Sequence, residues 1–172
     1  PIHILWINLI TDTFPAMALG TEIAEENIMN SPPRDARESL FAGGLGAGVI
    51  YQGAVIAALT LAAFVIGLPH GQTYGMTMAF VTLSMCEIFH SFNMRSRTKS
   101  IFRLPGHNRI LLWSMGLSFV LTMAVVYIPG LNGLFKLTAL SPVHLLLSIA
   151  CALVIVPVVE LVKLMGGRRG KS

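Results

Sequence analysis

Two long stretches without charge constrain this chain more than any other feature. Neither the stretch from Gly43 to Leu68 nor the one from Ile110 to Ile128 contains Asp, Glu, Lys or Arg, and each is long enough to cross a bilayer as a helix. A third stretch, Val143 to Val159, is apolar except for His144. Because 54% of all residues are hydrophobic and only 12% are charged, the composition favours a membrane bundle over a soluble domain.

Two further apolar stretches contain one acid each. The first, Ile2 to Gly20, contains Asp12, and the other, Gly75 to Met94, contains Glu87. We therefore predict an all-α membrane protein that forms one unit over residues 1–172. Its five transmembrane helices are expected at about 2–20, 43–68, 75–94, 109–128 and 143–164.

The cationic residues predict the orientation of these helices. Of the 12 Lys and Arg residues, all but Lys136 lie in 21–42, in 95–109 or in the C-terminal stretch from Lys163 onward. By the positive-inside rule, we expect the loops 21–42 and 95–108 and the C-terminus to be cytoplasmic. The basic charge is then explained by orientation and by contact with the lipid bilayer, and no nucleic-acid partner is expected.

This orientation places residue 1 outside the cytoplasm, where the chain enters its first span directly with Pro1. A cleaved signal peptide is not expected to leave a complete span at the new N-terminus. We therefore expect the sequence to be a fragment that lacks a substantial N-terminal part.

The first span contains polar residues that a purely structural span would avoid. Asn8, Thr11 and Asp12 stand at i, i+3 and i+4, which predicts one shared helix face. Pro15 has no N–H, so the carbonyl of Thr11 is expected to lose its helical partner. An amide, a hydroxyl, a carboxylate and a free carbonyl are oxygen ligands that suit Ca²⁺, and less well Mg²⁺, Mn²⁺ or an alkali cation. The alternative is a kinked span whose polar face only hydrogen-bonds to a neighbouring helix.

A second acid could complete such a site. Glu87 belongs to a polar stripe in the third span that also includes Thr77, Ser84 and Ser91. Since Asp12 and Glu87 hold similar positions in spans that run in the same direction, we expect them at similar depth. Glu87 could be a direct ligand, a proton-binding partner shared with His90, or an acid kept neutral by desolvation.

Other features suggest packing rather than transport. Gly44 and Gly48 create a small-residue face that allows close contact with another helix. In the last span we expect Pro157 to kink the helix, and Glu160 and Lys163 to form an interfacial ion pair.

The segment from Leu5 to Gly20, LWINLITDTFPAMALG, resembles the sixth transmembrane helix of P-type cation-transporting ATPases, in particular the calcium-pump branch. The resemblance continues in IMNSPPR at 28–34, in FHSFNMRS at 89–96 and in FKL at 135–137. It covers essentially the whole chain, as helices six to ten of a ten-helix transmembrane domain.

This resemblance implies specific roles for residues in two segments. Asn8, Thr11 and Asp12 would be cation ligands, with Asp12 bridging the sites of two-ion pumps. The loop with Pro32, Pro33 and Arg34 would couple the membrane part to the phosphorylation domain; the alternative is a polar linker stiffened by proline.

In the third span the chain departs from the family pattern. Ser84 falls where the animal reticulum pump has an eighth-helix acidic ligand, with Glu87 one turn further on. The number of ions is therefore left open. Gly44 and Gly48 could contact the fifth helix of such a pump, or pack within this chain.

The resemblance also implies a function for the whole protein. The chain would be the C-terminal part of an ATP-driven pump that exports Ca²⁺ across a bacterial plasma membrane. Its partner would be the N-terminal remainder of the same pump, which would bind ATP and Mg²⁺, because the phosphorylation sequence Asp-Lys-Thr-Gly-Thr is absent here. The fragment alone could not hydrolyse ATP. The alternatives are an ATP-independent secondary cation transporter and a non-catalytic membrane assembly subunit. The exact cation and the counter-ion stay open.

Overall fold

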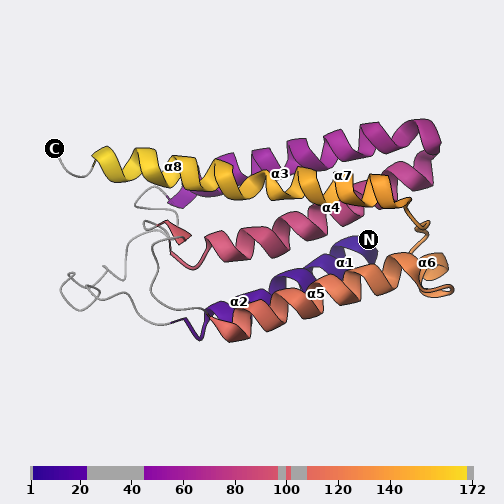
Figure 1. Ribbon diagram of the computed structural model, residues 1–172, viewed down its shortest axis with the longest axis horizontal. Coiled ribbons are helices and arrows are strands. Elements are labelled where there is room, and N and C mark those ends of the chain that lie inside the picture. Colours follow the sequence, from indigo (N-terminus) through magenta and orange to yellow (C-terminus); the bar gives the residue numbers. More distant parts are fainter. Residues whose placement is uncertain (1, 23–44, 97–99, 102–107, 170–172) are drawn as a thin grey trace.

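The computed structural model describes residues 2–22, 45–96, 100–101 and 108–169, and this part of the chain is helical and contains no strand (Figure 1). The first three elements join end to end into one span, Ile2–Leu19, called the first helix below. The elements are α1 (Ile2–Trp6), η1 (Ile7–Asp12), α2 (Thr13–Leu19), α3 (Leu45–Gly67), η3 (Leu68–His70), α4 (Gln72–Asn93), α5 (Arg109–Tyr127), α6 (Leu131–Leu134), α7 (Pro142–Leu153) and α8 (Ile155–Arg169).

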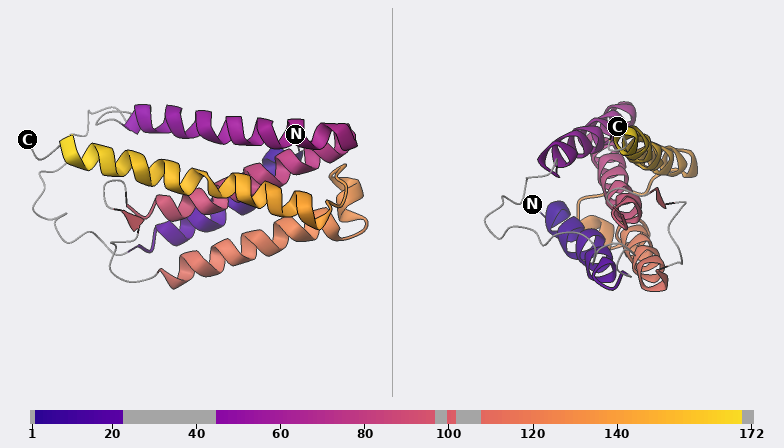
Figure 2. Two further views of the ribbon diagram at one scale, coloured as in Figure 1. Left: turned by 45° about the horizontal axis from the view of Figure 1, so that its top comes forward. Right: turned by 90° about the vertical axis from the view of Figure 1, so that its left-hand side faces the viewer.

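All five predicted long helices form, and four of them are both long and apolar enough to cross a membrane. These four are Ile2–Leu19, Gly46–His70, Arg109–Tyr127 and Pro142–Leu164. The fifth, α4, is 22 residues long but more polar. It lies in the middle of the bundle, with other helices around it (Figure 2). Its buried Thr77, Thr82 and Asn93 therefore meet protein partners, and the all-α membrane bundle predicted from the sequence is confirmed.

At one end of the bundle the links between helices are short. Gly71, with φ of 115°, is the only residue between η3 and α4. Beside this turn the ring of His70 packs against Tyr74 and His144, and the Tyr74 hydroxyl lies 3.0 Å from His144 Nδ1. This cluster attaches the α3–α4 hairpin to the start of α7. The opposite end of the bundle holds the last residues of α2 and α4 and the first residues of α3 and α5 (Figure 1).

The last span is interrupted, as the sequence predicts. α7 ends at Leu153, and α8 begins at Ile155 after a turn at Val154. Pro157 explains the break, because it offers no N–H to the carbonyl of Leu153 four residues earlier.

The predicted pair of Glu160 and Lys163 also forms, with Nζ 3.0 Å from Oε1, but the two side chains are only 8% and 6% exposed. The pair is buried because it contacts two other segments. Lys163 Nζ donates to the carbonyl of Asn93 at 2.8 Å, and the N–H of Ile101 donates to Glu160 Oε1 at 3.5 Å. The pair therefore attaches α8 to the end of α4 and to the segment that follows it.

A close contact between α3 and α4 uses glycines that the sequence analysis did not single out. A Cβ added at Gly67 would lie 2.8 Å from the Cα of Gly75, and one added at Gly75 would lie 2.8 Å from the carbonyl oxygen of Phe64. By contrast, a Cβ at Gly48 or Gly53 would meet no atom within 4 Å. Within the described residues, the close approach of α3 and α4 is therefore at their hairpin end.

Substitution of Gly75 by alanine should destabilise this hairpin. The added methyl group would collide with backbone, which cannot move aside as a flexible side chain can, so we expect a cost of about 1 to 3 kcal/mol. Gly116→Ala in α5 is the matched control, because its Cβ would meet nothing within 4 Å. The measurement is the thermal unfolding midpoint of the full-length protein in detergent, and equal midpoints for the two variants would contradict the packing described here.

Candidate cation-binding site

The polar segment predicted in the first helix is not an α-helix. Residues Ile7–Asp12 form the π-helix η1, in which hydrogen bonds run from i to i+5 and which is often found at functional sites. Two side-chain hydroxyls donate to its carbonyls. Thr11 Oγ1 donates to the carbonyl of Ile7 at 2.8 Å, and Thr13 Oγ1 donates to that of Asn8 at 2.7 Å. The irregular stretch therefore lies where the sequence places its oxygen-rich residues.

The π-helix changes which of these residues share a face. Asn8 and Asp12 are exposed on the surface of this chain, whereas Thr11 is buried at 1% exposure. A π turn contains more residues than the 3.6 of an α-helix, so residues four apart stay close while residues three apart diverge. The predicted common face of Asn8, Thr11 and Asp12 is therefore wrong for Thr11, whose hydroxyl bonds within its own helix.

Asp12 meets Glu87 across the interface between the first helix and α4. Their carboxyl groups are close enough to interact directly, and Glu87 is half-buried. The structure thus brings together the two acids that the sequence places at similar depth. Two carboxylates held this close repel each other unless a proton or a cation lies between them. The pair is a place where one or the other can bind.

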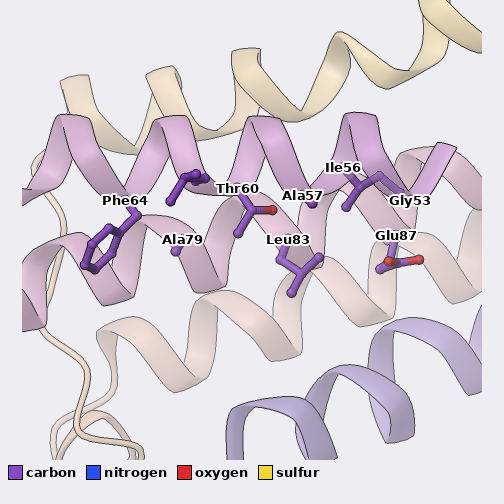
Figure 3. A pocket seen from close by; sticks show the side chains of 9 residues that line it. Gly53, Ile56, Ala57, Thr60, Phe64, Ala79, Leu83 and Glu87 are labelled. Carbon is purple, nitrogen blue, oxygen red and sulfur yellow. The ribbon is translucent and has the colours of Figure 1, made fainter. Parts of the chain in front are cut away.

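The other side of Glu87 faces a groove between α3 and α4 (Figure 3). The groove has a volume of about 600 Å³, and its walls are almost entirely apolar. Glu87 lies at one end, near Gly53 and Ile56, and Phe64 lies toward the other. Thr60 also lines it, with a hydroxyl that has no hydrogen-bond partner among the described residues. The carboxyl group of Glu87 therefore lies between Asp12 and an open apolar groove.

Two more polar groups of α4 lie near Glu87 in the sequence and are buried. Within the described part of the chain, neither Ser84 Oγ nor His90 Nδ1 has a hydrogen-bond partner. In all the residues that the structure describes, there is no group of three or more His, Cys, Asp or Glu side chains that could hold a metal ion. The candidate donors are therefore the Asn8 amide and the carboxylates of Asp12 and Glu87, all of them oxygen ligands.

Sequence reasoning missed the polar contacts that hold the first helix in place. Ser118 of α5 donates its hydroxyl to the carbonyl of Ile10 at 2.9 Å. Beyond α2, Arg95 Nη2 lies 2.7 Å from Glu22 Oε1, and Asn108 Nδ2 donates to Glu22 Oε2 at 2.8 Å and to the carbonyl of Ala18 at 3.1 Å. For the contacts around Glu22, the only signal in the sequence was the presence of opposite charges near helix ends. The proposed coupling residues Pro32, Pro33 and Arg34 lie outside the described residues.

Comparison with known proteins finds one family along nearly the whole chain. Residues 1–165 match the family described as "Cation transporting ATPase, C-terminus". The chain is 41% identical over 160 residues to calcium-transporting ATPase 1 of Bacillus cereus, covering 82% of this chain and 18% of that protein. It is 39% identical over 145 residues to a calcium-transporting ATPase of Bacillus subtilis, covering 83% and 16%. Similarity to rat calcium-transporting ATPase type 2C member 2 is 33% over 167 residues, covering 95% and 18%. The chain thus spans less than a fifth of the length of these curated relatives.

Proposed function

The chain belongs to the family of cation-transporting ATPase C-terminal regions, and from that premise we propose that it is the C-terminal transmembrane part of an ATP-driven P-type pump that exports Ca²⁺. The observation that supports this most directly is the meeting of Glu87 with Asp12, which lies four residues after Asn8 in an irregular stretch of a membrane helix. An acid at such a position is costly in a bilayer, so a bound cation or proton is needed to offset it.

The proposed site supplies part of a calcium coordination shell. One amide oxygen from Asn8 and two carboxylate oxygens each from Asp12 and Glu87 give at most about five ligands. Since Ca²⁺ takes about six to eight oxygens, the remaining ligands must come from other helices of the pump. The exposure of Asn8 and Asp12 on this chain supports that arrangement, because a further helix can approach them from outside.

We assign Thr11 a different contribution from the one its spacing predicts. Its hydroxyl is buried and donates to the carbonyl of Ile7, so it is directed away from Asn8 and Asp12. In the described conformation Thr11 stabilises the π-helix, and the proposed direct ligands are Asn8, Asp12 and Glu87.

The proposed partner is the N-terminal remainder of the same pump. That part would contain the phosphorylated aspartate, bind ATP and Mg²⁺, and contact the loop with Pro32, Pro33 and Arg34. The proposed location is a bacterial plasma membrane with a cytoplasmic C-terminus, supported by the bacterial relatives and by the cationic residues at the helix ends.

A transport assay on the full-length protein tests this function. In inside-out membrane vesicles we expect ATP to drive uptake of radioactive calcium, and we expect calcium to stimulate ATP hydrolysis by the purified protein. A proton gradient without ATP serves as the control. Uptake driven by that gradient alone would favour a secondary transporter, and calcium-insensitive ATP hydrolysis would contradict calcium as the substrate.

A further inference from the structure

Among the residues that the structure describes, a side chain of α5 hydrogen-bonds directly to the backbone of the π-helix. Ser118 Oγ donates to the carbonyl oxygen of Ile10 at 2.9 Å, although the two residues are 108 positions apart. Ile10 lies between Asn8 and Asp12, the residues proposed above to bind the cation. A contact to this carbonyl therefore acts on the backbone that determines where both ligands point.

Pro15 removes one backbone donor that could otherwise reach this carbonyl. In a π-helical register the carbonyl of residue 10 pairs with the N–H of residue 15. Residue 15 is proline and has no N–H, so the register leaves Ile10 without that partner. At α-helical spacing Pro15 leaves the carbonyl of Thr11 without a partner, as the sequence analysis predicts. The Ser118 hydroxyl donates to the Ile10 carbonyl, which Pro15 cannot do.

The surroundings of Ser118 make the bond difficult to replace. The side chain is fully buried, and so is Thr122 one turn later, whose hydroxyl donates to the carbonyl of Ser118 at 2.8 Å. Water cannot readily take the place of a lost hydroxyl in such an environment, so the Ile10 carbonyl would be left without this donor. The bond is thus part of the buried interface between α5 and the first helix.

Both ends of the first helix are fixed to other parts of the chain. His3 Nε2 donates to the carbonyl of Phe135 at 2.6 Å near the start, and Asn108 donates to the carbonyl of Ala18 near the end. Reversion of the π turn to α-helical spacing would rotate one part of the helix relative to the other by about 100°. The side chains of Asn8 and Asp12 would then turn relative to Glu87.

We propose that Ser118 is a positioning residue for the cation site: its hydroxyl holds Ile7–Asp12 in the π-helical form that places Asp12 beside Glu87. This inference rests on the proposed function for its consequence in transport. The bond itself is a property of the fold and can be tested separately.

The experiment compares three variants of the full-length protein in detergent. Ser118→Ala removes the donor, Ser118→Thr restores a hydroxyl, and Ser114→Ala is the matched control. Ser114 lies one turn earlier on α5, and its hydroxyl donates to Leu111 of its own helix at 2.8 Å. Hydrogen exchange of the peptide covering residues 2–20 reports on the backbone, and the calcium concentration for half-maximal ATP hydrolysis reports on the site.

For Ser118→Ala we expect exchange in residues 7–19 to rise about fivefold and the calcium midpoint to rise about fivefold. The maximal rate at saturating calcium should change less, because the lost bond affects the geometry of the ligands and not the ATP site. Ser118→Thr should restore both values, and Ser114→Ala should leave both unchanged. If the Ser118→Ala protein cannot be purified in folded form, Ser118→Cys gives the same comparison. Its thiol is a weak donor, so the rises in hydrogen exchange and in the calcium midpoint should be smaller.

Each outcome decides a different claim. Unchanged exchange in Ser118→Ala would overturn the positioning role whatever the ion. Raised exchange with an unchanged calcium midpoint would overturn the assignment of Ser118 to the cation site. Raised exchange in a protein whose ATP hydrolysis never responds to calcium would overturn the proposed function and leave the positioning of the π-helix supported.

Discussion

Replacement of Asp12 by asparagine should abolish the calcium dependence of phosphoenzyme formation from ATP in the full-length protein. The substitution keeps the size of the side chain but removes the negative charge that faces both Glu87 and the proposed cation. At a partly buried site, the loss of one carboxylate near a divalent cation weakens binding by about 100-fold or more. Calcium at concentrations that saturate the unmodified pump should therefore have no effect on the variant.

Two further measurements make this result interpretable. The thermal midpoint of Asp12→Asn should stay at or above that of the unmodified protein, because the substitution removes repulsion between two carboxyl groups. Glu87→Gln should raise the calcium midpoint without abolishing the response, since Asn8 and Asp12 remain. If Asp12→Asn instead keeps an unchanged calcium dependence, the assignment of the site to the first helix fails.

The second large effect is expected at the ion pair of Glu22 and Arg95, just beyond the end of the first helix. The Arg95 side chain is only 4% exposed, and its Nε and Nη2 atoms both donate to Glu22. Glu22→Gln removes a carboxylate charge that pairs with this guanidinium. Breaking a buried ion pair lowers the free energy of unfolding by about 3 to 5 kcal/mol. Because the Glu22 side chain is 19% exposed, we expect a loss at the lower end, about 3 kcal/mol.

A double-mutant cycle on the full-length protein in detergent measures this effect. The thermal midpoint of Glu22→Gln should fall by roughly 6 to 12 °C, because 1 kcal/mol shifts the midpoint of a unit of this size by about 2 to 4 °C. The double variant Glu22→Gln/Arg95→Met should regain part of the loss, because it removes the buried charge as well. Additive effects of the two single substitutions would show that the pair is not energetically coupled.

The same pair predicts how stability changes in acid. The hydrogen bond from Arg95 lowers the pKa of Glu22 below its ordinary value of 4.5. The unfolded chain then binds a proton at higher pH than the folded chain does. The contribution of the pair is therefore fully present above pH 4.5 and is lost as the pH falls through the lower pKa of the folded state. Glu22→Gln should flatten the pH dependence of the thermal midpoint in this range.

The sequence was sufficient to predict the helices and the general place of the site. Long apolar stretches define spans because a bilayer requires about 20 residues of helix, and this requirement does not depend on packing details. The polar stripe of α4 likewise predicted a helix facing protein, and buried Thr77 and Ser84 confirm it. Asp12 and Glu87 stood out because acids are rare within such spans.

The details of the site depended on contacts that local spacing does not encode. The i, i+3, i+4 rule assumes 3.6 residues per turn, so it placed Thr11 on the same face as Asn8 and Asp12. In the structure the π-helix turns the Thr11 side chain inward instead. Ser118 occurs in an uncharged span where nothing distinguishes it from Ser114. Only the three-dimensional arrangement shows that one hydroxyl donates to the first helix and the other to its own.

The bond between Ser118 and Ile10 also has a consequence for biosynthesis. The two residues are 108 positions apart, and ribosomes add about 5 to 20 residues per second. The first helix is therefore made on the order of 5 to 20 s before its donor from α5 exists. Throughout this interval the Ile10 carbonyl lacks Ser118, and during the earlier part of it, until α4 has been made, Asp12 also lacks Glu87. The helix must be sheltered by the insertion machinery or by earlier helices until α4 and α5 arrive, so nascent chains stalled before Ser118 should remain crosslinkable to that machinery through the first helix.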